Sequence, residues 1–298
     1  MPYKRHRFWL HGLLFLLTLA STTVIGARLA ENFKANRPAI YLAEDLDAYR
    51  KLLAQPDSWL GGMAYSLTLL TILLAHEMGH YFACRRYGLD ASLPFFMPFP
   101  SVIGTLGAFI RIRSPIYFRR VLFDIGIAGP VAGFVTLMPA AIYGIANSKV
   151  VPGIAAQADL RFGTPLVFKV LLGLLMPGAQ AVDISLHPVA QAAWVGVFAT
   201  ALNLLPIGQL DGGHILYAVC GDKHRILSRI FVLALLPLGL LYWPWLVWAV
   251  ILFFLGMRHP LIYDFAPLDR RRKFWAVFAL AMFLLCFMVA PIETGGGS

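Results

Sequence analysis

The chain has 298 residues, of which 59% are hydrophobic and only 13% are charged. A soluble domain carries about 25% charged residues, so this composition excludes an ordinary soluble protein. The net charge of +10 does not indicate nucleic-acid binding, because the basic residues lie between long apolar runs and form no single stripe. These runs are continuously apolar, which excludes a membrane β-barrel, whose strands alternate. We expect an all-α polytopic membrane protein.

The N-terminal region, residues 1–59, is predicted to hold one membrane anchor and one interfacial segment. The apolar run at about 8–29 follows three basic residues and is longer than the apolar part of a cleaved signal peptide, which favours an anchor. The polar stretch after it contains apolar residues within 46–53 at the spacing of a short amphipathic helix. Such a helix would lie at the membrane surface.

Four further apolar runs are predicted to cross the membrane, at about 60–84, 121–146, 188–205 and 274–290. The stretch at 165–182 is also apolar, but it contains Lys169 and Pro177. We therefore expect this stretch to be interfacial or re-entrant.

The run at 226–256 is long enough for one span or for two short ones. Tyr242-Trp243-Pro244-Trp245 interrupts it and would form a corner. A hairpin places most of the chain's 25 Lys and Arg residues on the membrane side that holds the N-terminus, whereas a single span weakens this bias. The positive-inside rule therefore favours the hairpin and seven spans, and a single span would give six.

The second predicted span contains His76-Glu77-Met78-Gly79-His80 near its C-terminal end. Two histidines four residues apart lie on one face of a helix, one turn apart, so both imidazoles can bind one tetrahedral zinc ion. Glu77 lies beside the first ligand and can reach a zinc-bound water without binding the metal itself. The alternative is a histidine pair satisfied inside a helical core, but three ionisable side chains in a span are costly without a purpose.

A third zinc ligand has to come from another span. The soluble zincin pattern would place a histidine at 86, where this chain has Arg86. Asp211 is the best candidate, because Pro206 and the neighbouring glycines allow the helix to end and the backbone to turn. The fourth span runs in the same direction as the second, so Asp211 lies at a similar depth. The alternative for Asp211 is a helix cap.

The two motifs together resemble the site-2 protease family. That family pairs H-E-x-x-H with a later N-x-x-P-x-x-x-x-D-G, and Asn203, Pro206, Asp211 and Gly212 match the second motif. The resemblance covers about 60–225. The segments 94–100 and 104–110, together with His187-Pro188, resemble the branch found in bacteria and chloroplasts that lacks a PDZ domain.

A substrate-binding strand is predicted at 104–110, where small and β-favouring residues alternate between Pro100 and Pro115. An extended substrate can add to a free strand edge through main-chain hydrogen bonds. The resemblance implies the same role, and we expect Gly104, Gly107 and Phe109 to bind substrate; the alternative is an ordinary turn. By resemblance Asn203 hydrogen-bonds the substrate or intermediate, and its alternative is a helix–helix hydrogen bond.

The resemblance implies an intramembrane zinc metalloprotease that hydrolyses transmembrane protein substrates, with one Zn²⁺ and Glu77 as general base. The expected partners are these substrates and the lipid bilayer, and the sequence leaves the oligomeric state open. We expect a bacterial cytoplasmic membrane, with the active site on the cytoplasmic side. The expected regions are an anchor and interfacial segment at 1–59, a metalloprotease core at 60–225, C-terminal spans at 226–292 and a linker or tag scar at 293–298.

Two other functions compete with the protease. A metal or solute transporter would be expected to show inverted repeats, which this sequence lacks, and has no need for Glu77. An inactive relative that binds transmembrane helices is disfavoured by the intact Glu77.

The remaining polar, glycine and cysteine residues are given structural roles. Asp124 is expected to cap a helix or to pair with Arg119 or Arg120. His214 is a candidate to support Asp211. Close helix packing is expected at Gly126, Gly129 and Gly133. Structural roles are expected for His187, Cys84, Cys220 and Cys286. The basic cluster at 270–273 is interpreted as a topology anchor.

Overall fold

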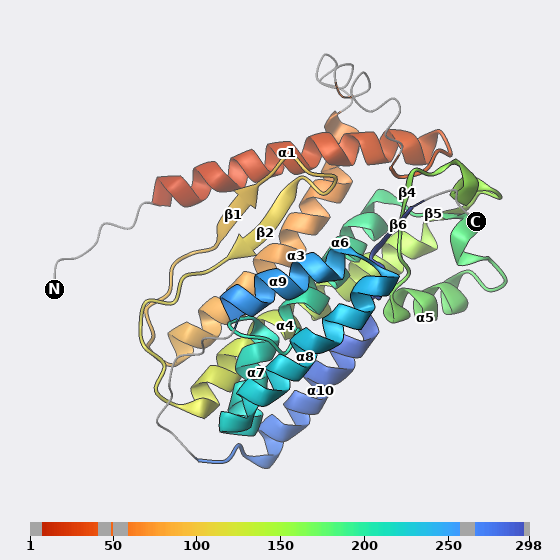
Figure 1. The fold of residues 1–298 in the computed structure, drawn as a ribbon. Coiled ribbons are helices and arrows are strands. Elements are labelled where there is room, and N and C mark those ends of the chain that lie inside the picture. The colour runs from red at the N-terminus through yellow and green to blue at the C-terminus, as the bar shows by residue number, and fades with distance from the viewer. Residues whose placement is uncertain (1–7, 41–48, 50–58, 257–265, 295–298) are drawn as a thin grey trace.

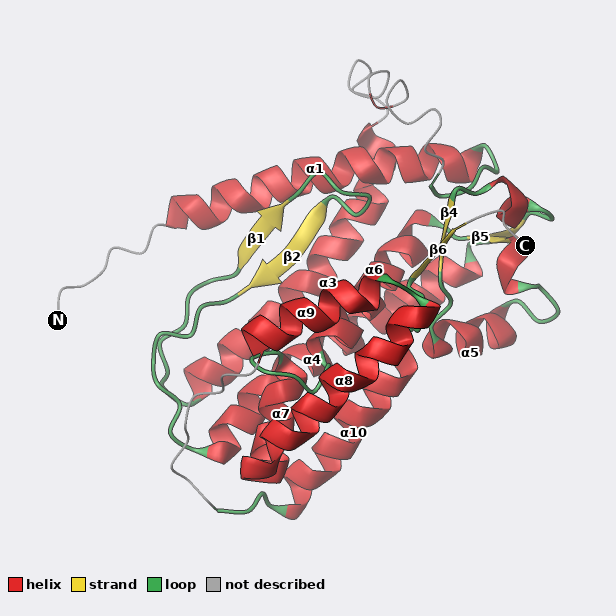
Figure 2. Ribbon diagram, viewed as in Figure 1, coloured by secondary structure: helices red, strands yellow, loops and turns green. Residues whose placement is uncertain are grey.

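The computed structural model describes residues 8–40, 49, 59–256 and 266–294, and it is predominantly helical (Figures 1 and 2). The described helices are α1 (Phe8–Lys34), α3 (Trp59–Arg86), α4 (Arg119–Ala146), α5 (Leu166–Leu175), α6 (Pro188–Asn203), α7 (Asp211–Cys220), α8 (His224–Leu241), α9 (Pro244–Gly256) and α10 (Arg270–Cys286). The expected amphipathic helix at 46–53 falls, except for Tyr49, outside the described residues.

Four of the described helices, α1, α3, α4 and α8, are long and apolar enough to cross a membrane. The helices α6, α9 and α10 are shorter, at 16, 13 and 17 residues. The helical membrane-protein class predicted from composition is confirmed at this level. The number of spans, six or seven, stays a prediction.

The run at 226–256 forms two helices, as the hairpin interpretation predicted. The chain leaves α8 at Tyr242 and enters α9 at Pro244. The two helices pack together, and a Cβ on Gly239 would lie 2.3 Å from the side chain of Leu246, so glycine allows close approach near the corner. A single straight helix is excluded.

Three helices, α3, α4 and α6, pack against one another at the centre of the molecule. The long helix α1 lies across one end of this bundle, and α8, α9 and α10 lie in front of it in the view of Figure 1. Contact between α1 and α3 is very close, because Gly26 and Gly62 face each other and the hydroxyls of Thr22 and Ser66 are 2.5 Å apart. The bundle thus presents α3, which carries the histidine motif, to neighbours on several sides.

The described strands form three two-stranded antiparallel sheets. In the first, β1 (Phe95–Pro98) pairs with β2 (Thr105–Phe109), and β2 is the strand predicted near 104–110. The other two sheets pair β3 (Lys149–Val150) with β5 (Ile184–Ser185) and β4 (Leu160–Phe162) with β6 (Ile292–Thr294). Strand β6 includes Glu293 and Thr294, the first residues of the segment predicted as a linker. No sheet large enough for a PDZ domain occurs among the residues that the structure describes.

Candidate metal centre

Two helices bring three side chains with metal-binding atoms to one buried point. His76 and His80 lie on adjacent turns of α3, and Asp211 is the first residue of α7. The two Nε2 atoms are 3.1 Å apart, and Oδ2 of Asp211 lies 3.2 Å from that of His76 and 3.3 Å from that of His80. The side chains are at most 15% exposed. The structure therefore brings together the three residues that the sequence predicted as ligands.

The spacing and protonation of these atoms fit a tetrahedral metal ion. Ligands placed tetrahedrally around zinc at bonds of about 2.0 Å lie about 3.3 Å from one another. Nδ1 of His80 is 2.8 Å from the carbonyl oxygen of Ile125, so this nitrogen carries a proton and Nε2 is the ring atom that faces Asp211. Two ring nitrogens and a carboxylate oxygen this close together need a positive charge among them, which a metal ion would supply. This donor set suits zinc.

Glycines on α4 make room for the two imidazoles. A Cβ on Gly129 would lie 2.1 Å from Nε2 of His80, and a Cβ on Gly133 would lie 3.2 Å from Nδ1 of His76. The sequence predicted close helix packing at these positions, and the structure adds that the packed groups are the candidate ligands themselves.

A tight turn after α6 presents Asp211 to the histidines. A Cβ on Gly212 would lie 2.1 Å from the carbonyl oxygen of Leu204, and one on Gly213 would lie 2.3 Å from that of Gly208. Both positions therefore require glycine, because the backbone of the turn lies directly against the start of α7. The glycines that follow Asp211 in the sequence motif serve this contact.

Glu77 borders a cavity of about 220 Å³ beside the three candidate ligands. The residue is only 7% exposed, and its carboxylate interacts with the backbone of Ile110, just after β2. At about 30 Å³ for each water molecule, the cavity has room for several. Its lining comes from α3, α4, α6, α9 and β2 and includes His76, Glu77, Leu106, Gly107, Ala108, Gly133, Thr200, Asn203 and Trp248.

A comparison with known protein families identifies the family to which this chain belongs. The model of peptidase family M50 matches residues 64–242, more than half of the chain, and this range contains the candidate ligands and Glu77. The chain belongs to peptidase family M50, the site-2 protease family.

This M50 chain is similar to plant proteins named as probable chloroplastic zinc metalloproteases. It is 30% identical over 236 residues to EGY1 of Oryza sativa subsp. japonica, which covers 75% of the chain and 40% of the relative. It is 28% identical over 299 residues to EGY1 of Arabidopsis thaliana (94% and 52%), and 29% identical over 275 residues to EGY2 of the same plant (89% and 47%). The chain spans about half of these relatives' length or less. Their chloroplast names give no support to the expected bacterial membrane.

The residues expected to bind substrate in this M50 chain separate into two groups. Gly107 borders the cavity, together with Leu106 and Ala108, which sequence reasoning missed. Gly104 instead shapes the β1–β2 turn at a positive φ of 86° and packs against Thr22 of α1. Phe109 stacks on Phe95, with ring centroids 5.5 Å apart. The structure does not bring Gly104 or Phe109 to the cavity.

Asn203 lies at the cavity, with its amide nitrogen 3.3 Å from Nε2 of His76. Thr200, one turn earlier on α6, and Trp248 on α9 also border the cavity. Neither belongs to a motif. Only the three-residue spacing between Thr200 and Asn203, which places both on one helix face, could have indicated Thr200. Nothing in the sequence indicated Trp248.

The prediction for Asp124 was wrong, because its partner is neither Arg119 nor Arg120. Asp124 accepts hydrogen bonds from Arg272 of α10, at 2.8 and 2.6 Å, and from the Tyr87 hydroxyl. The basic cluster at 270–273 therefore includes a residue that ties α10 to α4.

Two further histidines of the M50 chain, His187 and His214, have distinct surroundings. His187 caps α6 by accepting a hydrogen bond from the backbone N–H of Val189, which is a structural role. His214 lies on α7, one turn after Asp211, and faces Gly126 of α4. The three cysteines are free thiols.

Proposed function

We propose that this chain is the catalytic part of an intramembrane zinc metalloprotease that hydrolyses peptide bonds in or near transmembrane segments of protein substrates. One observation carries the proposal: His76, His80 and Asp211 converge beside Glu77, and His76 and Glu77 border a cavity with a strand along one wall. Membership of family M50 and the names of the plant relatives support the same activity.

Each side chain at the centre has a chemical task. His76, His80 and Asp211 would hold the zinc ion, which supplies Lewis acidity toward the scissile carbonyl and toward water. Glu77 takes the proton of the attacking water and passes it to the departing amine nitrogen. Asn203 is positioned to donate a hydrogen bond to a substrate oxygen in the cavity.

Strand β2 is suited to hold the substrate extended. Within the described residues β2 pairs with β1 alone, so its second edge is open to another strand. Leu106, Gly107 and Ala108 of β2 border the same cavity as Glu77. A helical substrate hides its carbonyls in helical hydrogen bonds, and pairing with β2 would replace those bonds while the substrate unwinds.

The cavity, which His76, Glu77, Thr200 and Asn203 line among apolar residues, lies in a bundle whose long helices are apolar enough to cross a membrane. We therefore infer that transmembrane proteins are the substrates and that water reaches the centre through this cavity. From the charge bias of the loops we infer that the centre lies toward the side of the membrane that holds the N-terminus.

The test is cleavage of a fused transmembrane substrate in proteoliposomes by the wild type and by Glu77→Gln, each with and without a zinc chelator. We expect cleavage by the wild type only, and its loss with the chelator, with a drop of about 10²–10⁴-fold for Glu77→Gln. Cleavage unaffected by Glu77→Gln would contradict the role of Glu77. A zinc-loaded wild type that binds but never cleaves such substrates would favour an inactive helix-binding relative, and ion transport without cleavage would favour a transporter.

A further inference from the structure

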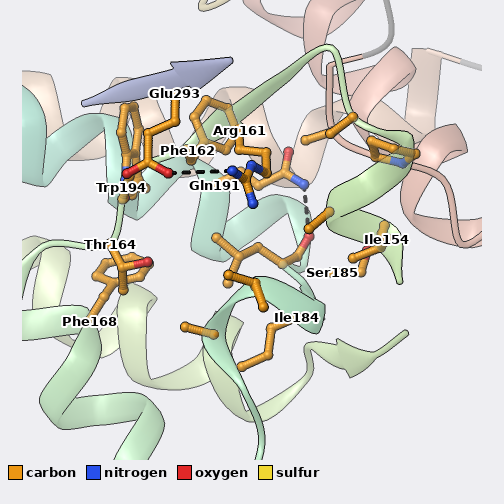
Figure 3. Close-up of a pocket in the computed structure, with 18 of the residues that line it drawn as sticks. Ile154, Arg161, Phe162, Thr164, Phe168, Ile184, Ser185, Gln191, Trp194 and Glu293 are labelled. Atoms are coloured by element: carbon orange, nitrogen blue, oxygen red, sulfur yellow. Dashed lines mark hydrogen bonds and ion pairs between the residues drawn. The ribbon is translucent and has the colours of Figure 1, made fainter. Parts of the chain in front are cut away.

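A second cavity, of about 110 Å³, lies at the other end of α6 from the metal centre (Figure 3). Gln191 and Trp194 in the first turns of α6 line it, whereas Asn203 at the metal centre is the last residue of that helix. At about 1.5 Å per residue, α6 separates Gln191 from Asn203 by about 18 Å. The remaining walls come from α5, from strands β4 and β6, and from the segment 181–186.

Two buried polar atoms in the wall of this cavity, Nε of Arg161 and Oε1 of Gln191, have no hydrogen-bond partner in the part of the chain that the structure describes. Gln191 is only 2% exposed. Its amide nitrogen donates to the carbonyl oxygen of Leu186 over 2.8 Å, so the orientation of the amide is fixed and Oε1 is left as an acceptor. Arg161 forms an ion pair of 3.8 Å with Glu293 on the adjacent strand.

The rest of the wall is largely apolar and aromatic. The ring centroids of Phe162 and Trp194 are 4.5 Å apart, and Phe168 is only 1% exposed. Figure 3 shows these rings and the side chains of Arg161 and Gln191 gathered around one space. The cavity therefore combines one donor, one acceptor and an apolar surface.

A peptide segment matches this combination better than an ion or water does. A peptide group carries one C=O, which accepts from Arg161, and one N–H, which donates to Gln191. A carboxylate would leave the Gln191 oxygen unsatisfied, and an ammonium group would leave Arg161 unsatisfied. One water molecule could accept from Arg161 and donate to Gln191, but at about 30 Å³ it would leave most of the 110 Å³ between the aromatic rings empty. The space thus fits one apolar side chain with its neighbouring peptide group.

We infer that this cavity is a second substrate subsite, which binds a short peptide segment continuing from the transmembrane part of the substrate toward the far end of the bundle. The inference rests on the proposed protease function. An extended chain covers the 18 Å between the two ends of α6 in about five or six residues. A substrate held at β2 would therefore need only a short further stretch of extended chain to reach the second subsite.

The test uses the full chain and two model substrates with the same transmembrane segment, one ending at that segment and one extended by about ten residues at the end away from the metal centre. Ala181 is exposed and lines the cavity, so Ala181→Trp blocks it from the surface. Gln191→Leu removes the acceptor. The matched control is Ala156→Trp, since Ala156 is exposed on the same side of the molecule but does not line the cavity.

For the wild type, we expect kcat/KM to be higher for the extended substrate than for the short one. Ala181→Trp and Gln191→Leu should lower the ratio of the two values by about tenfold, mainly through KM, and Ala156→Trp should leave the ratio unchanged. An unchanged ratio in Ala181→Trp and Gln191→Leu overturns the subsite, and so does an equal loss for both substrates.

A binding readout separates failure of this inference from failure of the protease function. In the Glu77→Gln background, a photo-cross-linking residue at position 181 should capture the extended substrate at least about fivefold more than the same residue at position 156. If the wild type cleaves neither substrate, the protease proposal fails while cross-linking still decides the subsite. Equal capture at positions 181 and 156 overturns the second subsite.

Discussion

Two aspartates on neighbouring helices have very different surroundings. Asp124 on α4 accepts two hydrogen bonds from the guanidinium of Arg272 and one from Tyr87. Asp211 on α7 has, within the described part of the chain, only the imidazoles of His76 and His80 as ion-pair partners. The first carboxylate is neutralised by a guanidinium that is always charged, and the second has two titratable imidazoles beside it.

Comparing Asp124 with Asp211 shows how a carboxylate with a structural role differs from a candidate metal ligand. Both lie in the bundle and both are partly or largely buried, with side chains 24% and 15% exposed. Burial therefore does not distinguish them. The distinction lies in whether the surrounding groups supply positive charge, because a buried carboxylate without a cation is costly. Asp124 has the permanently charged Arg272, whereas the ion-pair partners of Asp211 among the described residues are imidazoles, as expected of a metal ligand.

The largest contrast is expected from replacing each aspartate by asparagine. Asp211→Asn removes a charged ligand, so zinc affinity should fall by more than about 100-fold. This loss exceeds the one expected for residues that only orient a ligand. Cleavage should fall to background. Asp124→Asn should retain stoichiometric zinc. Metal analysis of the purified variants and a cleavage assay measure both, and equal zinc loss in the two variants would break the comparison.

Asn203→Ala tests whether the amide near His76 has a role separate from the metal. Since Asn203 lies 3.3 Å from His76 Nε2 but carries no charge, it cannot replace the cation. We expect zinc content to stay at the wild-type level while kcat falls about 10²–10³-fold, as for loss of a donor to a developing oxyanion. Loss of zinc would instead make Asn203 part of the metal-binding set.

Gly129→Ala should weaken the centre without touching a ligand. The added Cβ would lie 2.1 Å from Nε2 of His80, so the imidazole has to move and zinc affinity should fall by about 10–100-fold. Gly173→Ala is the matched control, because nothing lies within 4 Å of its Cβ on α5, and it should stabilise the helix by about 0.5–1 kcal/mol. A competition assay with a metal indicator compares the two, and equal affinities would show that α4 does not shape the site.

The smallest effect on the metal is expected from Arg272→Ala. This change leaves Asp124 without its cation and loosens α10 from α4, so stability should fall by about 1–3 kcal/mol. Zinc affinity should change less than twofold. Thermal unfolding and zinc titration measure the two quantities. Strong zinc loss would link the structural aspartate to the metal centre and remove the contrast between the two regions.

The sequence predicts which residues converge at the candidate metal centre, because metal chemistry fixes the spacing of such residues. His76 and His80 lie on the same helix face wherever that helix is located in the fold. The motif around Asp211 contains the glycines that its turn requires. The corner of the α8–α9 hairpin is similarly local, since Pro244 begins the second helix.

The parts that the sequence did not predict depend on contacts between distant segments. Arg272 and Asp124 are 148 residues apart, and either could have paired with a nearer charge. Strand β1 escaped prediction because it lies in a stretch rich in proline, which usually indicates a loop. Trp248 reaches the cavity only because the α8–α9 hairpin folds back over the centre.

The most direct measurement of the central claim is zinc X-ray absorption spectroscopy of the purified full chain. We predict one zinc ion per chain, with two imidazole nitrogens and oxygen ligands at about 2.0–2.2 Å, and loss of an oxygen ligand in Asp211→Asn. A sulfur ligand at about 2.3 Å, from Cys84, Cys220 or Cys286, or a spectrum unchanged by Asp211→Asn, would contradict it.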